Sequence, residues 1–86
     1  GKEVNDALTQ AQTAKGKIDL RTHQIESLED AVRSTQLLMT HGNTTYLEVL
    51  TAQQTLLSAQ LSQVTDRFDE LQATVNLYQA LGGGRH

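Results

Sequence analysis

Apolar residues recur every seven positions along two stretches of the chain, and this pattern predicts two helices that pack as a coiled coil. In the first stretch two such columns run side by side, one containing Val4, Ala11, Ile18, Ile25, Val32 and Met39, the other Ala7, Ala14, Arg21, Leu28 and Thr35. The second stretch repeats the period with Leu47, Gln54, Leu61, Phe68 and Val75, and with Leu50, Leu57, Val64, Leu71 and Tyr78. We therefore predict helices over residues 3–40 and 46–81, a turn over 41–45 and a flexible tail over 82–86.

A short connection joins the two predicted helices. Because the segment from His41 to Thr44 allows only antiparallel neighbours, the predicted fold class is all-α, an antiparallel helical hairpin with coiled-coil packing. In such a hairpin each column of one helix faces a column of the other. The predicted layers are Ile18 with Leu71, Ile25 with Val64, Leu28 with Leu61, Val32 with Leu57, and the polar pair Thr35 with Gln54.

A further apolar stripe lies beside the predicted seam of the second helix. It contains Val49, Ala52, Leu56 and Ala59, and it has no partner in the predicted hairpin. An apolar face wider than a two-stranded seam is typical of a helix that packs on two sides within a larger bundle or barrel. We therefore expect the chain, expressed by itself, to self-associate, for example as a dimeric four-helix bundle.

Composition limits the classes of protein that this chain can represent. With 86 residues, 37% hydrophobic residues, no proline or tryptophan and one phenylalanine, it has little material for a globular core. The formal net charge of −3 arises from scattered residues, so no charged arm for nucleic acid is present. The chain has no cysteine, and no apolar run approaches the roughly 20 residues that a bilayer-spanning helix needs.

Candidate chemistry is sparse. His23, His41 and His86 do not share the spacing with which helical histidines bind a metal, and no nucleophile lies near a base in a recognisable pattern. We predict no catalytic residues, no metal site, no cofactor and no enzymatic activity.

The turn carries the most specific local signals. Gly42 suits the left-handed residue that ends a helix. Thr45 and Glu48 then have the spacing of a capping box, in which the threonine caps the second helix and the glutamate reaches back to the amide of the cap.

Several motifs resemble those of the TolC-type outer-membrane efflux proteins of Gram-negative bacteria. The C-terminal half of that family typically contains a hairpin whose turn glycine precedes a Ser/Thr-Tyr-Leu-Glu-Val-Leu-x-Ala-Gln segment. A Leu-Leu-x-Ala-Gln segment follows, and Leu-Tyr-x-Ala-Leu-Gly-Gly-Gly ends the hairpin. The corresponding stretches here are Gly42, Thr45 to Gln53, Leu56 to Gln60 and Leu77 to Gly84.

This resemblance implies one hairpin of the periplasmic α-barrel of a homotrimeric outer-membrane efflux channel. Its partners would be a periplasmic adaptor protein and an inner-membrane transporter of a multidrug or type I export pump. The turn would be the docking tip for the adaptor, with Met39, Gly42, Asn43, Thr44 and Thr45 as the docking residues.

Glu48 and Thr51 correspond to aperture positions in some of these relatives. Three copies of Glu48 would form a carboxylate ring that attracts cations. Capping of the second helix competes directly with this role and is the favoured one, although one carboxylate can serve both. Met39 replaces a frequent tyrosine, Thr44 an arginine of some members, and Thr51 a second acid. These departures count against the tyrosine, arginine and aspartate gating network of those relatives. The alternative function is that of an interaction hairpin of a pump adaptor or of an unrelated coiled-coil scaffold.

Overall fold

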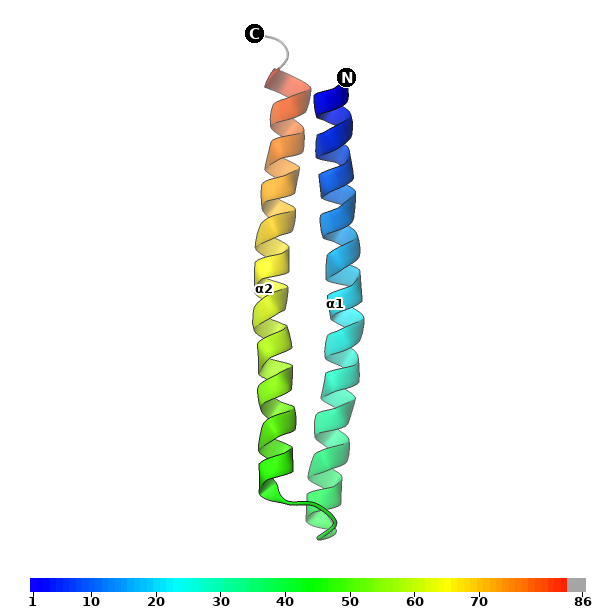
Figure 1. Ribbon diagram of the computed structural model, residues 1–86, viewed down its shortest axis with the longest axis vertical. Helices are drawn as coiled ribbons and strands as arrows, with labels where there is room; N and C mark the ends of the chain where they lie inside the picture. Colours follow the sequence, from blue (N-terminus) through cyan, green and yellow to red (C-terminus); the bar gives the residue numbers. More distant parts are fainter. Residues whose placement is uncertain (84–86) are drawn as a thin grey trace. The chain divides into compact units, whose positions relative to one another are not determined.

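The computed structural model describes residues 1–83 and contains two long helices in that range, α1 (Lys2–Thr40) and α2 (Tyr46–Gly83) (Figure 1). The predicted all-α hairpin is confirmed. Gly82 and Gly83, which we assigned to a flexible tail, are instead the last residues of α2. Residues 84–86 of the predicted tail lie outside the described part.

The chain divides into two compact units, each of which pairs a segment of α1 with a segment of α2. The terminal unit comprises Gly1–Leu20 and Val64–His86, and the turn unit comprises Arg21–Gln63. Within each unit the two helical segments run antiparallel (Figure 1).

The seam predicted for α1 is confirmed in both units. In the terminal unit Ala7 and Ala14 are buried and Val4, Ala11 and Ile18 are half-buried. The same two columns continue into the turn unit, where these members are buried or half-buried: Arg21, Ile25, Leu28, Val32 and Thr35. Met39, the last predicted member, is 37% exposed, so the seam ends before the turn.

The seam predicted for α2 is wrong. Of its members only Leu50 is half-buried, and the large ones are exposed, from 40% for Val75 to 71% for Tyr78. The inner seam is formed by two other heptad columns. In the turn unit these contain Val49, Ala52, Leu56, Ala59 and Gln63, and in the terminal unit Asp66, Glu70, Ala73, Leu77 and Ala80, all buried or half-buried.

The predicted layers are therefore wrong as well. Leu57, Leu61, Val64 and Leu71, which we placed opposite α1, are exposed by 54–65%. Polar contacts mark the observed register instead. In the turn unit Gln63 Nε2 donates a hydrogen bond to Thr22 Oγ1 at 3.3 Å, and in the terminal unit Lys17 Nζ lies 3.9 Å from Asp66 Oδ1.

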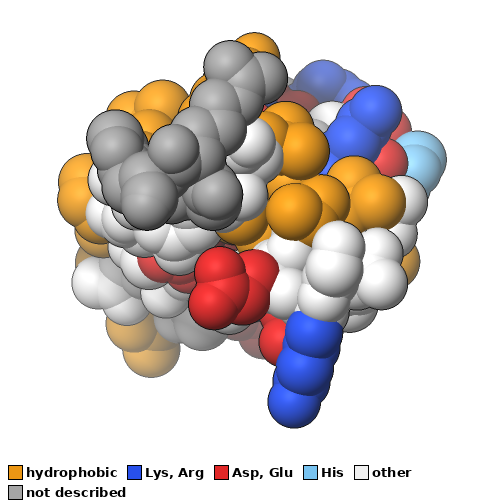
Figure 2. Space-filling model, turned by 90° about the horizontal axis from the view of Figure 1, so that it is seen from above, with side chains coloured by type: hydrophobic (Ala, Val, Ile, Leu, Met, Phe, Trp, Pro, Cys, Tyr) orange, Lys and Arg blue, Asp and Glu red, His pale blue; other side chains and the backbone are white. Residues whose placement is uncertain are grey.

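Both pairs of columns in α2 have the period of seven, so periodicity could not decide which one faces α1. The inner columns contain Ala52, Ala59 and Ala73, whose short side chains allow the two helices of the hairpin to approach closely. The stripe Val49, Ala52, Leu56 and Ala59, which we expected to lack a partner, thus belongs to the hairpin seam. The bulkier stripe remains exposed. Seen from the end of the molecule that carries the termini, hydrophobic side chains are visible on the surface (Figure 2).

Candidate functional site

The turn between α1 and α2 begins with a regular helix stop. Gly42 has φ of 74°, and it is the only residue of the described chain with a left-handed conformation. Its amide donates to the carbonyl of Met39 at 3.0 Å, and the amide of Asn43 donates to that of Leu38 at 2.8 Å. These two bonds constitute a Schellman motif with Gly42 at C′, as the sequence predicts.

His41 provides an additional bond at the same helix end. Its Nδ1 lies 2.9 Å from the carbonyl oxygen of Leu37, which also accepts the His41 amide at 3.2 Å. The ring therefore gives the Leu37 carbonyl a second partner at the helix end. The turn backbone is tied to the last turn of α1.

Thr45 caps the start of α2. Its carbonyl accepts the amides of Glu48 and Val49 at 3.1 and 3.4 Å, and its hydroxyl oxygen lies 3.4 Å from the Glu48 amide. The hydroxyl of Thr44 donates to the carboxylate of Glu48. The predicted capping box is therefore modified, because the bond that the structure shows from the carboxylate runs to Thr44, one residue before the cap.

The candidate docking and aperture residues lie on both sides of this turn, with Met39 in the last turn of α1 and the others in the turn or at the start of α2. Asn43, Thr45, Glu48 and Thr51 are exposed, and Thr44 is half-buried. The structure connects Thr44, Thr45 and Glu48 through hydrogen bonds. Thr51 lies one helical turn further, and its hydroxyl donates to the carbonyl of Leu47 at 2.9 Å.

Four exposed apolar residues beside the turn were not among the predicted site residues. Leu37 and Leu38 precede the turn and are 61% and 47% exposed, while Tyr46 and Leu47 follow it and are 65% and 70% exposed. The exposure of Leu37 and Leu38 could have been predicted from the sequence, because both residues lie outside the two seam columns of α1. Their exposure adds apolar contact area on both sides of the polar turn.

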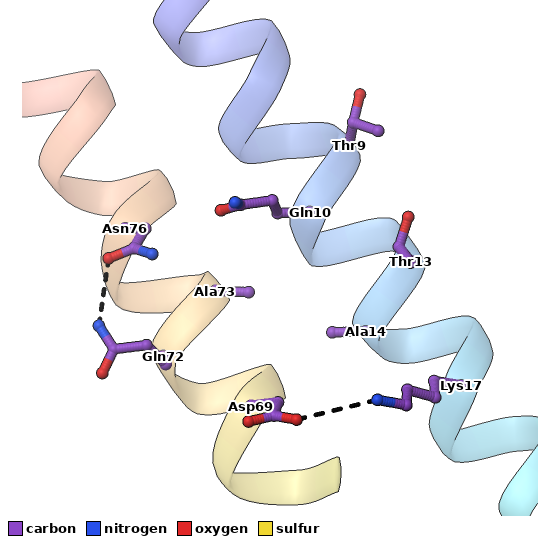
Figure 3. Close-up of a pocket in the computed structure, with 9 residues that line it drawn as sticks. All are labelled: Thr9, Gln10, Thr13, Ala14, Lys17, Asp69, Gln72, Ala73 and Asn76. Atoms are coloured by element: carbon purple, nitrogen blue, oxygen red, sulfur yellow. Dashed lines mark hydrogen bonds and ion pairs between the residues drawn. The ribbon is translucent and has the colours of Figure 1, made fainter.

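A groove runs between α1 and α2 in the terminal unit (Figure 3). Ala14 and Ala73 point toward each other between the helices. Lys17 Nζ lies 4.0 Å from Asp69 Oδ2 and also contacts Asp66, whose side chain is only 4% exposed. The remaining lining is made of hydroxyl and amide groups from Thr9, Gln10, Thr13, Gln72 and Asn76.

The turn unit has a comparable groove. Its lining combines hydroxyl groups of α2 with longer polar side chains of both helices: Arg21, Gln24, Thr51, Gln54, Thr55, Ser58 and Ser62, together with Leu28 and Ala59. Neither groove places a nucleophile beside a general base. Both are polar surfaces flanking a helical seam.

Neither a metal-binding cluster nor a bilayer-spanning helix occurs in the described part of the chain. Residues 1–83 contain no group of three or more histidine, cysteine, aspartate or glutamate side chains that could hold a metal ion. Within the same range neither helix combines the length and apolar character that a bilayer-spanning segment requires.

The structure thus defines a class of protein, a coiled-coil hairpin with a doubly capped turn and a second apolar stripe on one helix. The family model described as outer membrane efflux protein matches residues 1–83. The chain therefore belongs to the outer membrane efflux protein family. The resemblance noted in the sequence is confirmed.

Individual relatives agree with this assignment. The chain is 34% identical over 82 residues to a probable efflux pump outer membrane protein, TtgC, of Pseudomonas putida KT2440, and these residues are 95% of this chain and 17% of TtgC. It is 32% identical over 83 residues to the cation efflux system protein CusC of Escherichia coli K12, covering 96% of this chain and 18% of CusC. The chain is also 31% identical over 83 residues to the solvent efflux pump outer membrane protein SrpC of Pseudomonas putida, and these residues are 96% of this chain and 18% of SrpC.

The chain thus spans less than a fifth of the length of these relatives. No solved structure matches it.

Proposed function

We propose that this hairpin forms part of the periplasmic helical barrel of a homotrimeric outer-membrane efflux channel. The observation that carries the proposal is the pair of stripes on α2, one packed against α1 and the other exposed with the same heptad spacing. A helix in the wall of a barrel has a neighbour on each of two sides, so it requires two such stripes. A two-stranded coiled coil that functions alone requires only one.

The turn is the proposed docking tip for a periplasmic adaptor protein, which connects the channel to an inner-membrane transporter. The Schellman motif and the threonine cap hold Gly42, Asn43 and Thr45 in one backbone arrangement, which lowers the conformational entropy lost on binding. Exposed Leu38 and Tyr46 beside the turn supply apolar area for the contact. In this role the channel conducts solutes passively, and the transporter provides the energy.

Glu48 is the proposed aperture residue, with Thr51 one turn further along the same helix. The carboxylate accepts a hydrogen bond from Thr44 while the residue stays exposed, so one side chain serves the turn and remains accessible. Three such carboxylates around a threefold axis attract cations and repel one another, which favours an entrance that can open.

Site-directed crosslinking in the full-length channel tests the docking tip. The sequence has no cysteine, so Asn43→Cys and Thr44→Cys introduce single reactive positions within this segment. With a bifunctional thiol reagent we expect both variants to capture the adaptor in intact cells. Gln60→Cys, an exposed position well away from the turn, is the matched control and should give little adduct. Capture from Gln60→Cys but from neither tip variant would contradict docking at the turn.

The alternative function, a hairpin of an adaptor or of an unrelated scaffold, gains no support from the comparisons. The family match covers nearly the whole chain, and the relatives named above are all efflux system proteins.

A further inference from the structure

The terminal unit exposes a row of large apolar side chains on α2 that no part of the unit covers. These residues, which we call the outer stripe, are Val64, Phe68, Leu71, Val75 and Tyr78, with exposed fractions of 65, 66, 61, 40 and 71%. Their spacing alternates between four and three residues. Such spacing is the signature of a surface that packs against another α-helix by knobs-into-holes contacts.

The outer stripe contains no charged residue. The exposed leucines of α1 in this unit, Leu8 and Leu20, are isolated along their helix and do not form a comparable row. When the chain is alone in solution, the apolar heptad face that matches the outer stripe is therefore the same stripe on a second copy. From these observations we infer that the outer stripe is a self-association surface, through which α2 of one copy packs on α2 of another.

The available area is sufficient for this contact. Five side chains of this size and exposure offer roughly 500 Å² on each copy, or about 1,000 Å² in total, which reaches the lower limit for a specific interface. The turn unit carries further members of the same columns, Leu57 and Leu61, which are also more than half exposed.

Side-chain size favours an antiparallel arrangement of the two α2 helices. In a parallel pair each layer contains the same residue twice, so a layer of two phenylalanines would adjoin a layer of two valines. In an antiparallel pair Phe68 can pack on Leu71 of the second copy, and Val64 on Val75 of the second copy. Successive layers of the antiparallel pair then have similar widths, so the two helices can pack without leaving voids.

Charge then selects between two antiparallel registers. If Phe68 packs on Leu71 of the second copy, Arg67 lies beside Thr74 of the second copy. If Phe68 packs on Val64 of the second copy, the two Arg67 side chains flank the seam at the same height and repel each other. The first register is therefore the favoured one.

This dimer differs from the arrangement expected from the sequence. We had expected self-association through Val49, Ala52, Leu56 and Ala59, but those residues belong to the inner seam. The inference uses the same exposed stripe that the proposed function assigns to a neighbouring helix of the barrel. Its test concerns the chain alone and involves neither the adaptor nor the turn, so the two proposals can fail separately.

Sedimentation equilibrium of the 86-residue chain tests the inference. We expect a dimer at roughly 100 µM, and Leu71→Lys should weaken association by about a hundred-fold or more because two apolar contacts are lost in each dimer. Leu20→Lys makes the same change at a leucine of α1 that is 73% exposed, against 61% for Leu71, and should leave the association constant within about three-fold. Circular dichroism verifies that both variants remain helical, and Leu71→Ala provides a milder variant should the lysine disturb folding.

Disulfide trapping tests the register. We expect Val64→Cys and Val75→Cys chains to form a disulfide when mixed, and neither variant to form one alone. A disulfide from Val64→Cys alone would overturn the antiparallel register. A monomeric wild-type chain, or equal weakening by Leu20→Lys and Leu71→Lys, would overturn the self-association surface itself.

Discussion

Replacement of Gly42 by alanine isolates the contribution of one backbone conformation to the stability of the turn. A Cβ added at Gly42 would meet no atom within 4 Å, so the substitution creates no steric clash with neighbouring side chains. The residue does have φ of 74°, a region in which an L-residue is disfavoured by about 1–2 kcal/mol. Alanine also lowers the conformational entropy of the unfolded chain, and this effect stabilises the folded state by about 0.4–1 kcal/mol. The expected net loss in free energy of unfolding is therefore about 1 kcal/mol.

Gly16→Ala provides a matched control with the opposite sign. This glycine lies inside α1, and a Cβ there also meets no atom within 4 Å. Because the backbone is already helical, alanine should raise the free energy of unfolding by about 1 kcal/mol. The same methyl group is added in both variants, so only the backbone conformation distinguishes them.

Thermal and urea unfolding followed by far-ultraviolet circular dichroism measure both changes. All variants are compared at one protein concentration, because self-association makes the midpoint depend on concentration. For a chain of this size a change of 1 kcal/mol shifts the melting temperature by roughly 4–8 °C. Gly42→Asn should fall between wild type and Gly42→Ala, since asparagine tolerates the left-handed region. The reasoning is refuted if Gly42→Ala is as stable as wild type while Gly16→Ala shows its expected gain.

Three further predictions concern the helix start, the buried carboxylate and the Glu48 charge. Thr45→Ala should lower the free energy of unfolding by about 1 kcal/mol in urea titrations because α2 loses its cap, whereas Thr45→Ser should retain it; an unchanged alanine variant would show that the cap contributes nothing. Asp66→Leu combined with Lys17→Met, which replaces both members of the ion pair at the inner seam with apolar groups, should be neutral or stabilising in urea titrations, and a clear loss of stability would contradict this. If Glu48 forms the aperture ring, Glu48→Gln in the full-length channel should reduce cation selectivity in planar bilayers, and an unchanged reversal potential would argue for a capping role alone.

Much of the fold could be predicted from the chain because the signals are local. The seven-residue period located both helices, and the glycine followed by a threonine and a glutamate located the turn. The seam of α1 was also predictable, since α1 has only one apolar stripe. On α2 the predicted seam was wrong. Two heptad stripes compete there, and the more hydrophobic one, which includes Leu61 and Phe68, is the one that remains exposed.

The candidate site was predictable to a similar degree. Gly42 and Thr45 act as their residue types and positions suggest. The partner of the Glu48 carboxylate was not predictable, because Thr44 and the cap amide lie within similar reach and only the geometry of the turn distinguishes them. The exposed apolar residues around the turn, such as Tyr46 and Leu47, were missed because solvent exposure depends on which face of α2 turns toward α1.

The sequence by itself determined the two helices, the capped turn between them and the family, because each of these depends on residues close together in the chain or on motifs read in order. Tertiary structure decided which stripe of α2 faces α1. That choice depends on how alanine and polar side chains such as Gln63 and Asp66 fit against the facing helix, and on the contacts they make with Thr22 and Lys17. Periodicity carries no information about such fits, since every stripe with a period of seven can form a seam. The same choice leaves the bulkier stripe available for another helix.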